Sequence, residues 1–295
     1  MNPACKETSL PPIQSHVSFR RLTTFGIGGE ARYFAEAHSI EELRALFAFC
    51  RSNCLPYLVL GKGSNFLMHD GFFPGLAILM KIDPCLHVGQ GIWQSGAGYS
   101  FSLLGSRTAK EGWSGLEFAA GIPASVGGAI FMNAGANGQE TQNCLTHVEY
   151  LSPDGILQVL RKEDLLFGYR SSSFHSLPGA ILGARFQLQP NPHAREKQLA
   201  IIHYRQATQP YGERSAGCVF CNPSGQHAGA LIEQAGLKGY AIGGASVSTL
   251  HANFIINHSQ ATCRDVQSLM LHVQQEVLRV HGIFLEPEIR QIQEC

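Results

Sequence analysis

The sequence predicts a fold of mixed α-helices and β-strands, and two observations support that prediction. Apolar residues recur at helical spacing near both ends of the chain, and short apolar runs separated by turn residues fill its middle. The length of 295 residues is enough to bury a large core and suggests two or three domains.

The first region alternates helix and strand patterns. Ser39 and Glu42 resemble a capping box, and apolar residues follow at helical spacing: Leu43, Leu46, Phe47 and Cys50. The apolar run 58–60 then predicts a strand that enters the glycine-rich loop 61–65. A phosphate fits such a loop, because backbone N–H groups converge only where side chains are absent.

Residues 76–187 predict mainly strands. The expected strands are 76–80, 92–95, 148–151, 156–160 and 180–188, with one helix after Ser100. The turn 152–155 (Ser-Pro-Asp-Gly) joins two of these strands as a hairpin. The segment 189–192 (Gln-Pro-Asn-Pro) interrupts the pattern and predicts a linker.

Three helices are expected in the rest of the chain, near 194–206, 227–235 and 263–281. The last of them has an apolar face and ends at Gly282, a residue type favoured just after a helix. The residues of that face are Val266, Leu269, Val273 and Val277.

The charge balance argues against a nucleic-acid-binding protein. Lys and Arg number 22, as do Asp and Glu, so there is no basic excess. The N-terminus lacks the apolar core of a signal peptide. The longest uncharged stretch, 118–139, contains Pro123 and five glycines, so we expect loop and turn in a soluble protein rather than a membrane span.

The cysteines predict thiols in a reducing compartment, because they are odd in number and lack the spacing of a disulfide framework. They are Cys5, Cys50, Cys54, Cys85, Cys144, Cys218, Cys221, Cys263 and Cys295. Cys218 and Cys221 form a CxxC pattern. A zinc site would need two further ligands, and a redox pair would stand at a helix start, so we interpret them as two unconnected thiols.

Other common fingerprints are incomplete. Residues 26–31 match GxGxxA, but 32–34 read as a strand where a dinucleotide-binding fold requires a helix. In 121–138, glycines and other small residues recur at short intervals. Such spacing lets a flat or anionic ligand approach the backbone, and it is equally typical of tightly packed turns.

A set of ordered segments resembles the UDP-N-acetylenolpyruvoylglucosamine reductase family, in its shorter second type. The resemblance runs from about residue 18 to 292. Its segments are TFGIGG (24–29), GKGSN (61–65), GIPASVGGA (121–129), MNAGA (132–136), GYRSSSF (168–174), SAGCVFCNP (215–223), LKGYAIGGA (237–245), HANFIIN (251–257) and LEPEIR (285–290).

The resemblance implies an α+β fold, in which a two-subdomain FAD-binding fold of the vanillyl-alcohol-oxidase (PCMH) type precedes a C-terminal α/β substrate-binding domain. The expected boundaries are 1–80 for the first FAD-binding subdomain, 81–189 for the second and 193–295 for the substrate-binding domain.

The implied activity is the FAD-dependent, NADPH-driven reduction of enolpyruvyl-UDP-N-acetylglucosamine to UDP-N-acetylmuramate. This is a cytoplasmic step of peptidoglycan synthesis and so of cell-wall formation, cell shape and division. Hydride passes from flavin N5 to C3 of the enolpyruvyl group, and a proton passes to C2. We expect a monomer that binds a small sugar nucleotide, with no metal, nucleic acid or membrane partner.

The resemblance also implies catalytic roles. Arg170 would hold the substrate carboxylate, and Glu288 would assist it, although both read as surface charges from the residues alone. Cys218 stands where serine is common and would protonate C2, since a thiol of pKa about 8.5 is mostly protonated at pH 7. Cys221 replaces a frequent lysine, and Asn137 replaces a frequent aromatic residue.

The remaining site residues follow from the same resemblance. Those expected to bind FAD are Gly61, Lys62, Gly63, Ser64, Asn65, Gly121, Ile122, Pro123, Ser125, Gly127, Gly128, Asn133, Ala134 and Gly135. Those expected to bind substrate are Tyr169, Asn222, His251 and Asn253. Without the resemblance, Lys62 reads as a solvated loop residue and His251 as a structural histidine.

Two alternatives stay open at this point. An FAD-dependent sugar or alcohol oxidase could use the same flavin scaffold, because a fold does not determine a function. The second alternative is a non-enzymatic module whose CxxC pattern binds a metal or has a redox role. Flavin absorbance separates the second from both enzymes, and oxygen consumption with a sugar alcohol separates the two enzymes.

Overall fold

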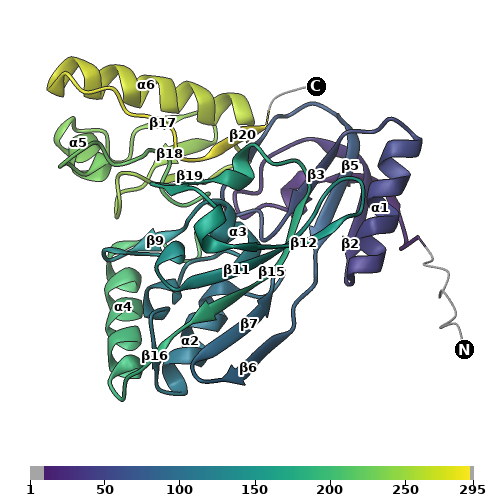
Figure 1. The fold of residues 1–295 in the computed structure, drawn as a ribbon. Helices are drawn as coiled ribbons and strands as arrows, with labels where there is room; N and C mark the ends of the chain where they lie inside the picture. The colour runs from purple at the N-terminus through teal and green to yellow at the C-terminus, as the bar shows by residue number, and fades with distance from the viewer. Residues whose placement is uncertain (1–9, 293–295) are drawn as a thin grey trace, which may run out of the picture. The chain divides into compact units, whose positions relative to one another are not determined.

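The computed structural model describes residues 10–292, which form two compact units (Figure 1). Unit 1 comprises the described part of Met1–Ser15, together with Tyr33–Gly61 and Pro74–Gln198. Unit 2 comprises His16–Arg32, Lys62–Phe73 and the described part of Leu199–Cys295. The expected domains 1–80, 81–189 and 193–295 are continuous segments, whereas these units interleave along the chain.

A four-stranded sheet contains the first strands, in the order β1-β2-β5-β3. Its strands are β1 (Gln14–Ser18), β2 (Glu30–Ala37), β5 (Phe73–Met80) and β3 (Tyr57–Leu60), and β3 runs parallel to β5. The predicted strands at 32–34, 58–60 and 76–80 are therefore confirmed.

Helix α1 (Ile40–Ser52) begins after Ser39, whose Oγ accepts a hydrogen bond from the Glu42 N–H at 3.1 Å. The Glu42 carboxylate accepts from the His38 N–H at 2.7 Å rather than from Ser39, so the predicted capping box is displaced by one residue. The four apolar residues predicted for its inner face are buried: Leu43, Leu46, Phe47 and Cys50.

The larger sheet of unit 1 has five strands in the order β12-β11-β15-β7-β6, with every neighbouring pair antiparallel. They are β6 (Cys85–Gly89), β7 (Ile92–Gly96), β11 (Leu145–Leu151), β12 (Leu157–Arg161) and β15 (Ala180–Gln187). The predicted hairpin is confirmed, because the Ser152 N–H donates to the Ile156 carbonyl at 3.0 Å and Gly155 has φ 82°.

Short strand pairs complete unit 1. They are β8 (Trp113–Ser114) with β16 (Gln189–Pro190), β9 (Gly135–Ala136) with β10 (Gln139–Glu140), and β13 (Phe167–Gly168) with β14 (Ser171–Ser172). The linker predicted at 189–192 thus starts inside a strand pair. The chain instead leaves unit 1 after Gln198, within α4 (Ala194–Thr208).

Two further helices belong to unit 1. Helix α2 (Phe101–Lys110) begins after Ser100 as predicted. The stretch 118–139, expected to be loop and turn, contains helix α3 (Val126–Phe131). Two interactions offset the low helix propensity of its glycines. The Ser125 Oγ accepts from the Gly128 N–H at 3.2 Å, and the Gly127 N–H donates to the Ala97 carbonyl at 2.9 Å.

Unit 2 has its own apolar core around α6 (Cys263–His281). Helix α6 buries the predicted Val266, Leu269, Val273 and Val277, and it ends at Gly282, which has φ 70°. Its other elements are α5 (Ala228–Gln234), the three-stranded sheet β17 (Ala241–Ile242), β18 (Ala245–Val247) and β19 (Ile255–Asn257), and the parallel pair β4 (Phe66–Met68) with β20 (Arg290–Ile292).

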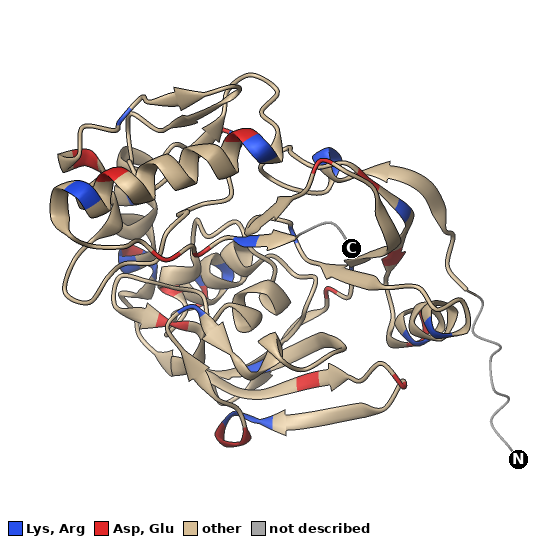
Figure 2. Cartoon of the chain, turned by 90° about the horizontal axis from the view of Figure 1, so that it is seen from above, with Lys and Arg blue, Asp and Glu red and all other residues tan. Residues whose placement is uncertain are grey.

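Within residues 10–292 the seven cysteines present are all thiols, as predicted, while Cys5 and Cys295 lie outside the described residues. No helix of the described chain is long and apolar enough to cross a membrane. Figure 2 shows acidic and basic residues interspersed along the described chain, in line with the balanced composition.

Candidate active site

Glycines allow two segments of unit 1 to meet at the end of β3. A Cβ added to Gly61 would lie 2.2 Å from the Ser125 Oγ, and one added to Gly127 would lie 2.9 Å from the Ala97 Cβ. These approaches leave no room for a side chain at either position. The structure therefore brings Gly61 against Ser125, just before α3, and both are positions predicted to bind a cofactor.

Gly128 differs from its neighbours because it is partly exposed and a Cβ there would meet only the Ser125 Oγ, at 3.4 Å. The space on the Cβ side of this glycine is therefore nearly open. Nearby, Gly121 has φ 84° and donates its N–H to the Ser102 Oγ at 2.8 Å. A surface made of glycine backbone and small side chains fits the close approach of a flat or anionic group such as a flavin nucleotide.

Asn133 is buried and has a left-handed backbone, with φ 42°. Its Nδ2 donates to the Glu140 carboxylate at 2.9 Å and to the Gly168 carbonyl at 3.0 Å. Its Oδ1 accepts from the Gln142 N–H at 3.1 Å. Both amide hydrogens thus bond within the protein, so this side chain holds the surrounding chain in place.

Tyr169 and Arg170 form the two-residue tip of the β13–β14 hairpin, in which Gly168 pairs with Ser171. Arg170 has φ 53°, and its guanidinium lies 4.9 Å from the centre of the Tyr169 ring. The Ser172 hydroxyl donates to the Phe131 carbonyl at 2.6 Å. Together with the Asn133–Gly168 bond, this contact fixes the base of the hairpin on the end of α3.

In unit 2, the segment 218–221 is extended and pairs with other segments on both sides. On one side the Val219 N–H donates to the Asn253 carbonyl at 2.8 Å. On the other, the Glu288 N–H donates to the Val219 carbonyl at 2.7 Å, and the Cys221 N–H donates to the Glu286 carbonyl at 2.8 Å. The structure therefore places the predicted Cys218 and Glu288 on adjacent segments, whereas Arg170 belongs to unit 1.

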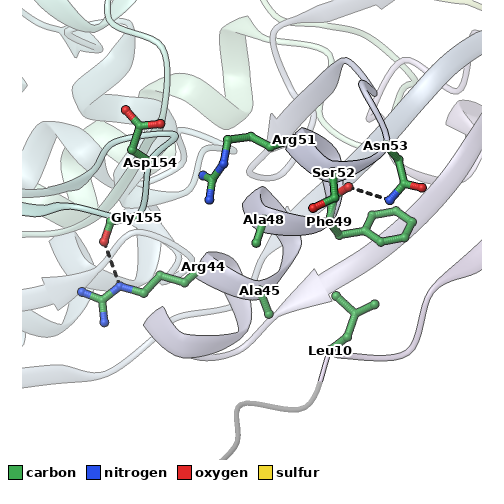
Figure 3. A pocket seen from close by; sticks show the side chains of 10 residues that line it. All are labelled: Leu10, Arg44, Ala45, Ala48, Phe49, Arg51, Ser52, Asn53, Asp154 and Gly155. Atoms are coloured by element: carbon green, nitrogen blue, oxygen red, sulfur yellow. Dashed lines mark hydrogen bonds between the residues drawn. The ribbon is translucent and has the colours of Figure 1, made fainter.

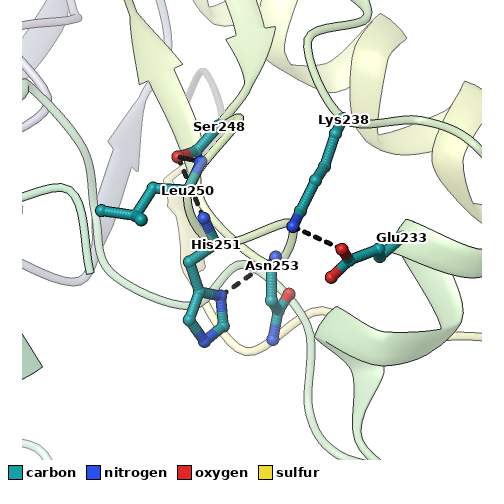
Figure 4. Close-up of polar contacts among 6 residues, drawn as sticks. All are labelled: Glu233, Lys238, Ser248, Leu250, His251 and Asn253. Atoms are coloured by element: carbon teal, nitrogen blue, oxygen red, sulfur yellow. Dashed lines mark hydrogen bonds and ion pairs between the residues drawn. The ribbon is translucent and has the colours of Figure 1, made fainter. Parts of the chain in front are cut away.

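The Asn253 side chain aligns this segment. It accepts from the Phe220 N–H at 3.0 Å and donates to the Phe220 carbonyl at 2.8 Å. The residue is buried, and its own N–H donates to the His251 Nδ1 at 3.3 Å (Figure 4). Asn253, predicted to bind substrate, thus directs its amide to the backbone two residues after Cys218.

His251 is half-buried, and burial lowers the pKa of its imidazole. The hydrogen bond that its Nδ1 accepts leaves the ring proton of the neutral form on Nε2. The Ser248 Oγ accepts from the His251 backbone N–H at 3.3 Å, and Glu233 and Lys238 form an ion pair at 2.6 Å close by (Figure 4). The ring therefore supports the turn that presents Asn253.

Asn222 and Asn65 also make backbone contacts. The Asn222 Oδ1 accepts from the Ala228 N–H at 3.0 Å, at the start of α5. The Asn65 carbonyl accepts from the Arg290 N–H at 2.9 Å, and its Nδ2 donates to the Glu288 carbonyl at 3.4 Å. Residues 62–65 of the predicted cofactor loop thus adjoin the segment that bears Glu288.

The CxxC pattern does not form a redox pair in this geometry. Three residues of extended chain separate the Cα atoms of Cys218 and Cys221 by about 10 Å, beyond the reach of a disulfide. The described part of the chain contains no group of three or more metal-ligating side chains. The separation of the two Cα atoms agrees with the interpretation of two unconnected thiols.

Sequence reasoning missed Glu140 and Ser172, which hold Asn133 and the arginine hairpin. Polar residues beside glycine turns are common in proteins, so no sequence pattern distinguishes these two residues from others. A cavity of about 620 Å³ lies elsewhere in unit 1, against α1 (Figure 3). None of the predicted site residues lines it.

Comparisons with known proteins give two family matches along the chain. Residues 31–161 match a family model described as FAD binding domain, and residues 209–292 match one described as UDP-N-acetylenolpyruvoylglucosamine reductase, C-terminal domain. The reductase of that name from Protochlamydia amoebophila is 54% identical over 280 residues, which are 95% of this chain and 93% of the relative. That from Chlamydia trachomatis serovar A is 44% identical over 278 residues, covering 94% and 95%.

A solved structure is also similar along nearly the whole chain. The crystal structure of the reductase from Thermus caldophilus has a TM-score of 0.81 and 36% identity, and the match covers 96% of this chain and 100% of that one. Together with the FAD binding domain match, this confirms the predicted α+β fold, with an FAD-binding part followed by a separate C-terminal domain.

Proposed function

The chain belongs to the UDP-N-acetylenolpyruvoylglucosamine reductase family, and from this premise we propose that it reduces the enolpyruvyl ether of UDP-N-acetylglucosamine to UDP-N-acetylmuramate. The observation that carries the proposal is the match over 95% of the chain to a relative of this name. We further propose that it does so in the cytoplasm, on a small sugar nucleotide, without a nucleic-acid or membrane partner.

FAD, reduced by NADPH, supplies the hydride for C3 of the enolpyruvyl group. The residues proposed to hold it are the glycine surface at Gly61 and 121–128, with 62–65 and 133–135. Within this set Gly128, which has no side chain, leaves space beside the start of α3, and Lys62 supplies positive charge for phosphate.

Arg170 binds the substrate carboxylate in this proposal. Its planar guanidinium suits two parallel hydrogen bonds to a carboxylate, and it stabilises the negative charge that spreads onto that group as C3 accepts hydride. The support is the fixed hairpin, which Asn133 and Ser172 hold to the end of α3. A fixed hairpin base lowers the entropy lost when Arg170 engages its ligand.

Cys218 then protonates C2, and Glu288 assists from the adjacent segment. The Cys218 side chain is half-buried and follows Gly217, at which an added Cβ would meet nothing within 4 Å. Backbone hydrogen bonds on both sides of 219–221 hold the backbone next to the thiol in place. After turnover the thiolate regains its proton from water.

The variants Cys218→Ser and Cys218→Ala test this assignment. Loss of a positioned acid costs about 10²–10⁴ in rate, so the alanine variant should form product that much more slowly, and the serine variant should keep an intermediate rate. Reduction of the flavin by NADPH should be unchanged in both, because that half-reaction needs no proton at C2. An alanine variant that incorporates solvent deuterium at C2 at the wild-type rate would disprove the role of Cys218.

The overall reaction is tested anaerobically. Flavin absorbance should disappear on addition of NADPH and return on addition of the enolpyruvyl substrate. If only oxygen restores it, the chain is an oxidase instead.

A further inference from the structure

We propose that Thr24 is a positioning residue, which holds the segment that bears Cys218 against the loop 62–65. The inference rests on the proposed function, in which Cys218 protonates C2 and residues 62–65 help to hold the flavin. Thr24, this loop and Cys218 all belong to unit 2. Hydride and proton are delivered to adjacent carbons of one substrate, so the thiol must be held in a defined position relative to the flavin.

Thr24 bonds to both segments. Its backbone N–H donates to the Gly63 carbonyl at 3.2 Å, and its hydroxyl donates to the Ser215 carbonyl at 2.7 Å. Gly63 permits the first contact, because it has φ 63° and an added Cβ would overlap the Leu22 carbonyl oxygen. A single residue thus joins the predicted cofactor loop to a point three residues before Cys218.

Asn257, which is buried, connects the same two segments a second time. Its Nδ2 donates to the Phe25 carbonyl at 2.9 Å, and its backbone N–H donates to the Arg214 carbonyl at 2.9 Å. A Cβ added to Gly26 would lie 3.2 Å from the Arg214 Cδ, so the two segments also approach each other directly. Of these connections, the hydroxyl bond of Thr24 reaches the residue nearest to Cys218 in sequence.

The chain between Ser215 and Cys218 contains a position with unusual backbone freedom. Gly217 has φ 78°, and an added Cβ there would meet nothing within 4 Å. Ala216 is buried, and the bond from Thr24 to the Ser215 carbonyl orients the peptide group that joins residues 215 and 216. The hydrogen bonds of 219–221 hold the chain after Cys218, so the Thr24 bond limits the movement that Gly217 allows before it.

Thr23 offers a matched control, because its hydroxyl bonds within its own segment. Its Oγ1 donates to the Phe19 carbonyl at 3.1 Å and to the Ile27 carbonyl at 3.4 Å. Thr23 is buried, whereas Thr24 is exposed. Because a lost hydrogen bond is more costly at a buried site, Thr23→Val should lower the free energy of unfolding more than Thr24→Val does. An effect on protonation is expected from Thr24→Val alone.

Single-turnover kinetics of the flavin-loaded chain test the inference. Thr24→Val should slow reoxidation of the reduced flavin by the enolpyruvyl substrate about ten- to a hundredfold, because a small misplacement of a reacting group is costly. Thr24→Ser keeps the hydroxyl and should keep most of the wild-type rate, and Thr23→Val should react as the wild type does. Reduction by NADPH should be unchanged in all three. Wild-type reoxidation in Thr24→Val overturns the inference, whereas a wild type that the substrate does not reoxidise contradicts the proposed function itself.

Two further measurements show whether Thr24 acts through Cys218. In the Cys218→Ala background, Thr24→Val should cause no additional loss of rate, because the acid that it positions is already absent. Amide hydrogen exchange of residues 215–218, followed without substrate, should be faster in Thr24→Val than in the wild type and Thr23→Val. Rate losses that add in the double variant, or wild-type exchange at 215–218 in Thr24→Val, would each contradict the positioning role.

Discussion

Asn133 illustrates how one residue can support a site through hydrogen bonds within the protein. Asparagine tolerates the left-handed backbone better than most residues, and the φ of 42° ends α3 at this point. The same residue then bonds to Glu140, Gly168 and Gln142. A buried side chain that satisfies three partners links the helix of the glycine surface to the hairpin of Arg170.

Asn133→Ala should therefore lower both stability and turnover. Losing these hydrogen bonds should cost about 2–4 kcal/mol of the free energy of unfolding, because Asn133 is buried and its partners are left without it in a half-buried setting. The KM for the enolpyruvyl substrate should rise as Arg170 loses its fixed position. Urea unfolding and steady-state kinetics measure the two effects.

Asn137→Ala is the matched control. Asn137 also has a left-handed backbone, with φ 53°, but it is exposed. Its replacement should cost only the backbone strain of about 1 kcal/mol. If the two variants lose stability equally, the hydrogen bonds of Asn133 contribute nothing and its proposed positioning role is wrong.

His251 should make stability depend on pH. Burial lowers the pKa of its imidazole, so the unfolded chain takes up the proton at a higher pH than the folded chain does. The stabilising contribution of the neutral ring is complete above the ordinary pKa of about 6.5 and declines as the pH falls below it. Unfolding free energies from pH 7.5 to about 5.5 should fall more in the wild type than in His251→Gln. Parallel curves would show that the ring is not responsible.

The roles of single residues were only partly predictable. Cys218, Arg170 and Glu288 are ordinary residues in the sequence until the order of the surrounding segments identifies the family. No spacing rule could show that Asn253 bonds to the Phe220 backbone, because that contact joins residues 33 positions apart. Long-range hydrogen bonds of this kind arise from the tertiary fold.

Among the elements, helix α6 shows how the start of a helix draws on distant residues. Thr262 and Asp265 form a capping box at the start of the helix, and the hydrogen bond from the Thr262 N–H lowers the pKa of the Asp265 carboxyl. Asp70, far away in sequence, adds a second carboxylate that accepts from the Cys263 N–H at 2.9 Å and the Arg264 N–H at 3.4 Å. Negative charge near a helix N-terminus is stabilising.

Replacing Asp70 should separate hydrogen bonding from charge. Asp70→Ala removes both and should cost about 1–2 kcal/mol of unfolding free energy. Asp70→Asn keeps an acceptor and should cost about half as much. Urea unfolding followed by helical circular dichroism measures both. An alanine variant with the wild-type midpoint would mean that Thr262 and Asp265 suffice to cap α6.

Elements with strong local signals were predicted well. Helices α1, α2 and α6 have capping residues and a clear apolar face, so local chemistry determines their ends. Helix α3 was missed because its interior contains Gly127 and Gly128, which weaken helix propensity. Contact of Gly127 with Ala97 compensates, and a reading of local sequence cannot include that contact.

At the scale of the whole molecule, the chain forms two units, and each unit is assembled from several separate segments of the sequence. Unit 2 takes His16–Arg32 and Lys62–Phe73 from the N-terminal part, and the parallel pairing of β4 with β20 ties the second of these segments to the C-terminus. Neither composition nor turn residues mark these crossings. The number of cores could be estimated from length, whereas the assignment of segments to cores depends on pairings distant in sequence.

Because the chain has two separate apolar cores, we expect FAD to stabilise one unit more than the other. A ligand stabilises only the cooperative unit to which it binds, by about 2.7 kcal/mol at a concentration one hundred times its dissociation constant. Most of the proposed flavin contacts belong to unit 1, whereas α6 packs in the core of unit 2. Hydrogen exchange should therefore slow strongly in α3 and β7 on flavin binding and change little in α6. Equal slowing in all three elements would show that the two cores unfold as one cooperative unit.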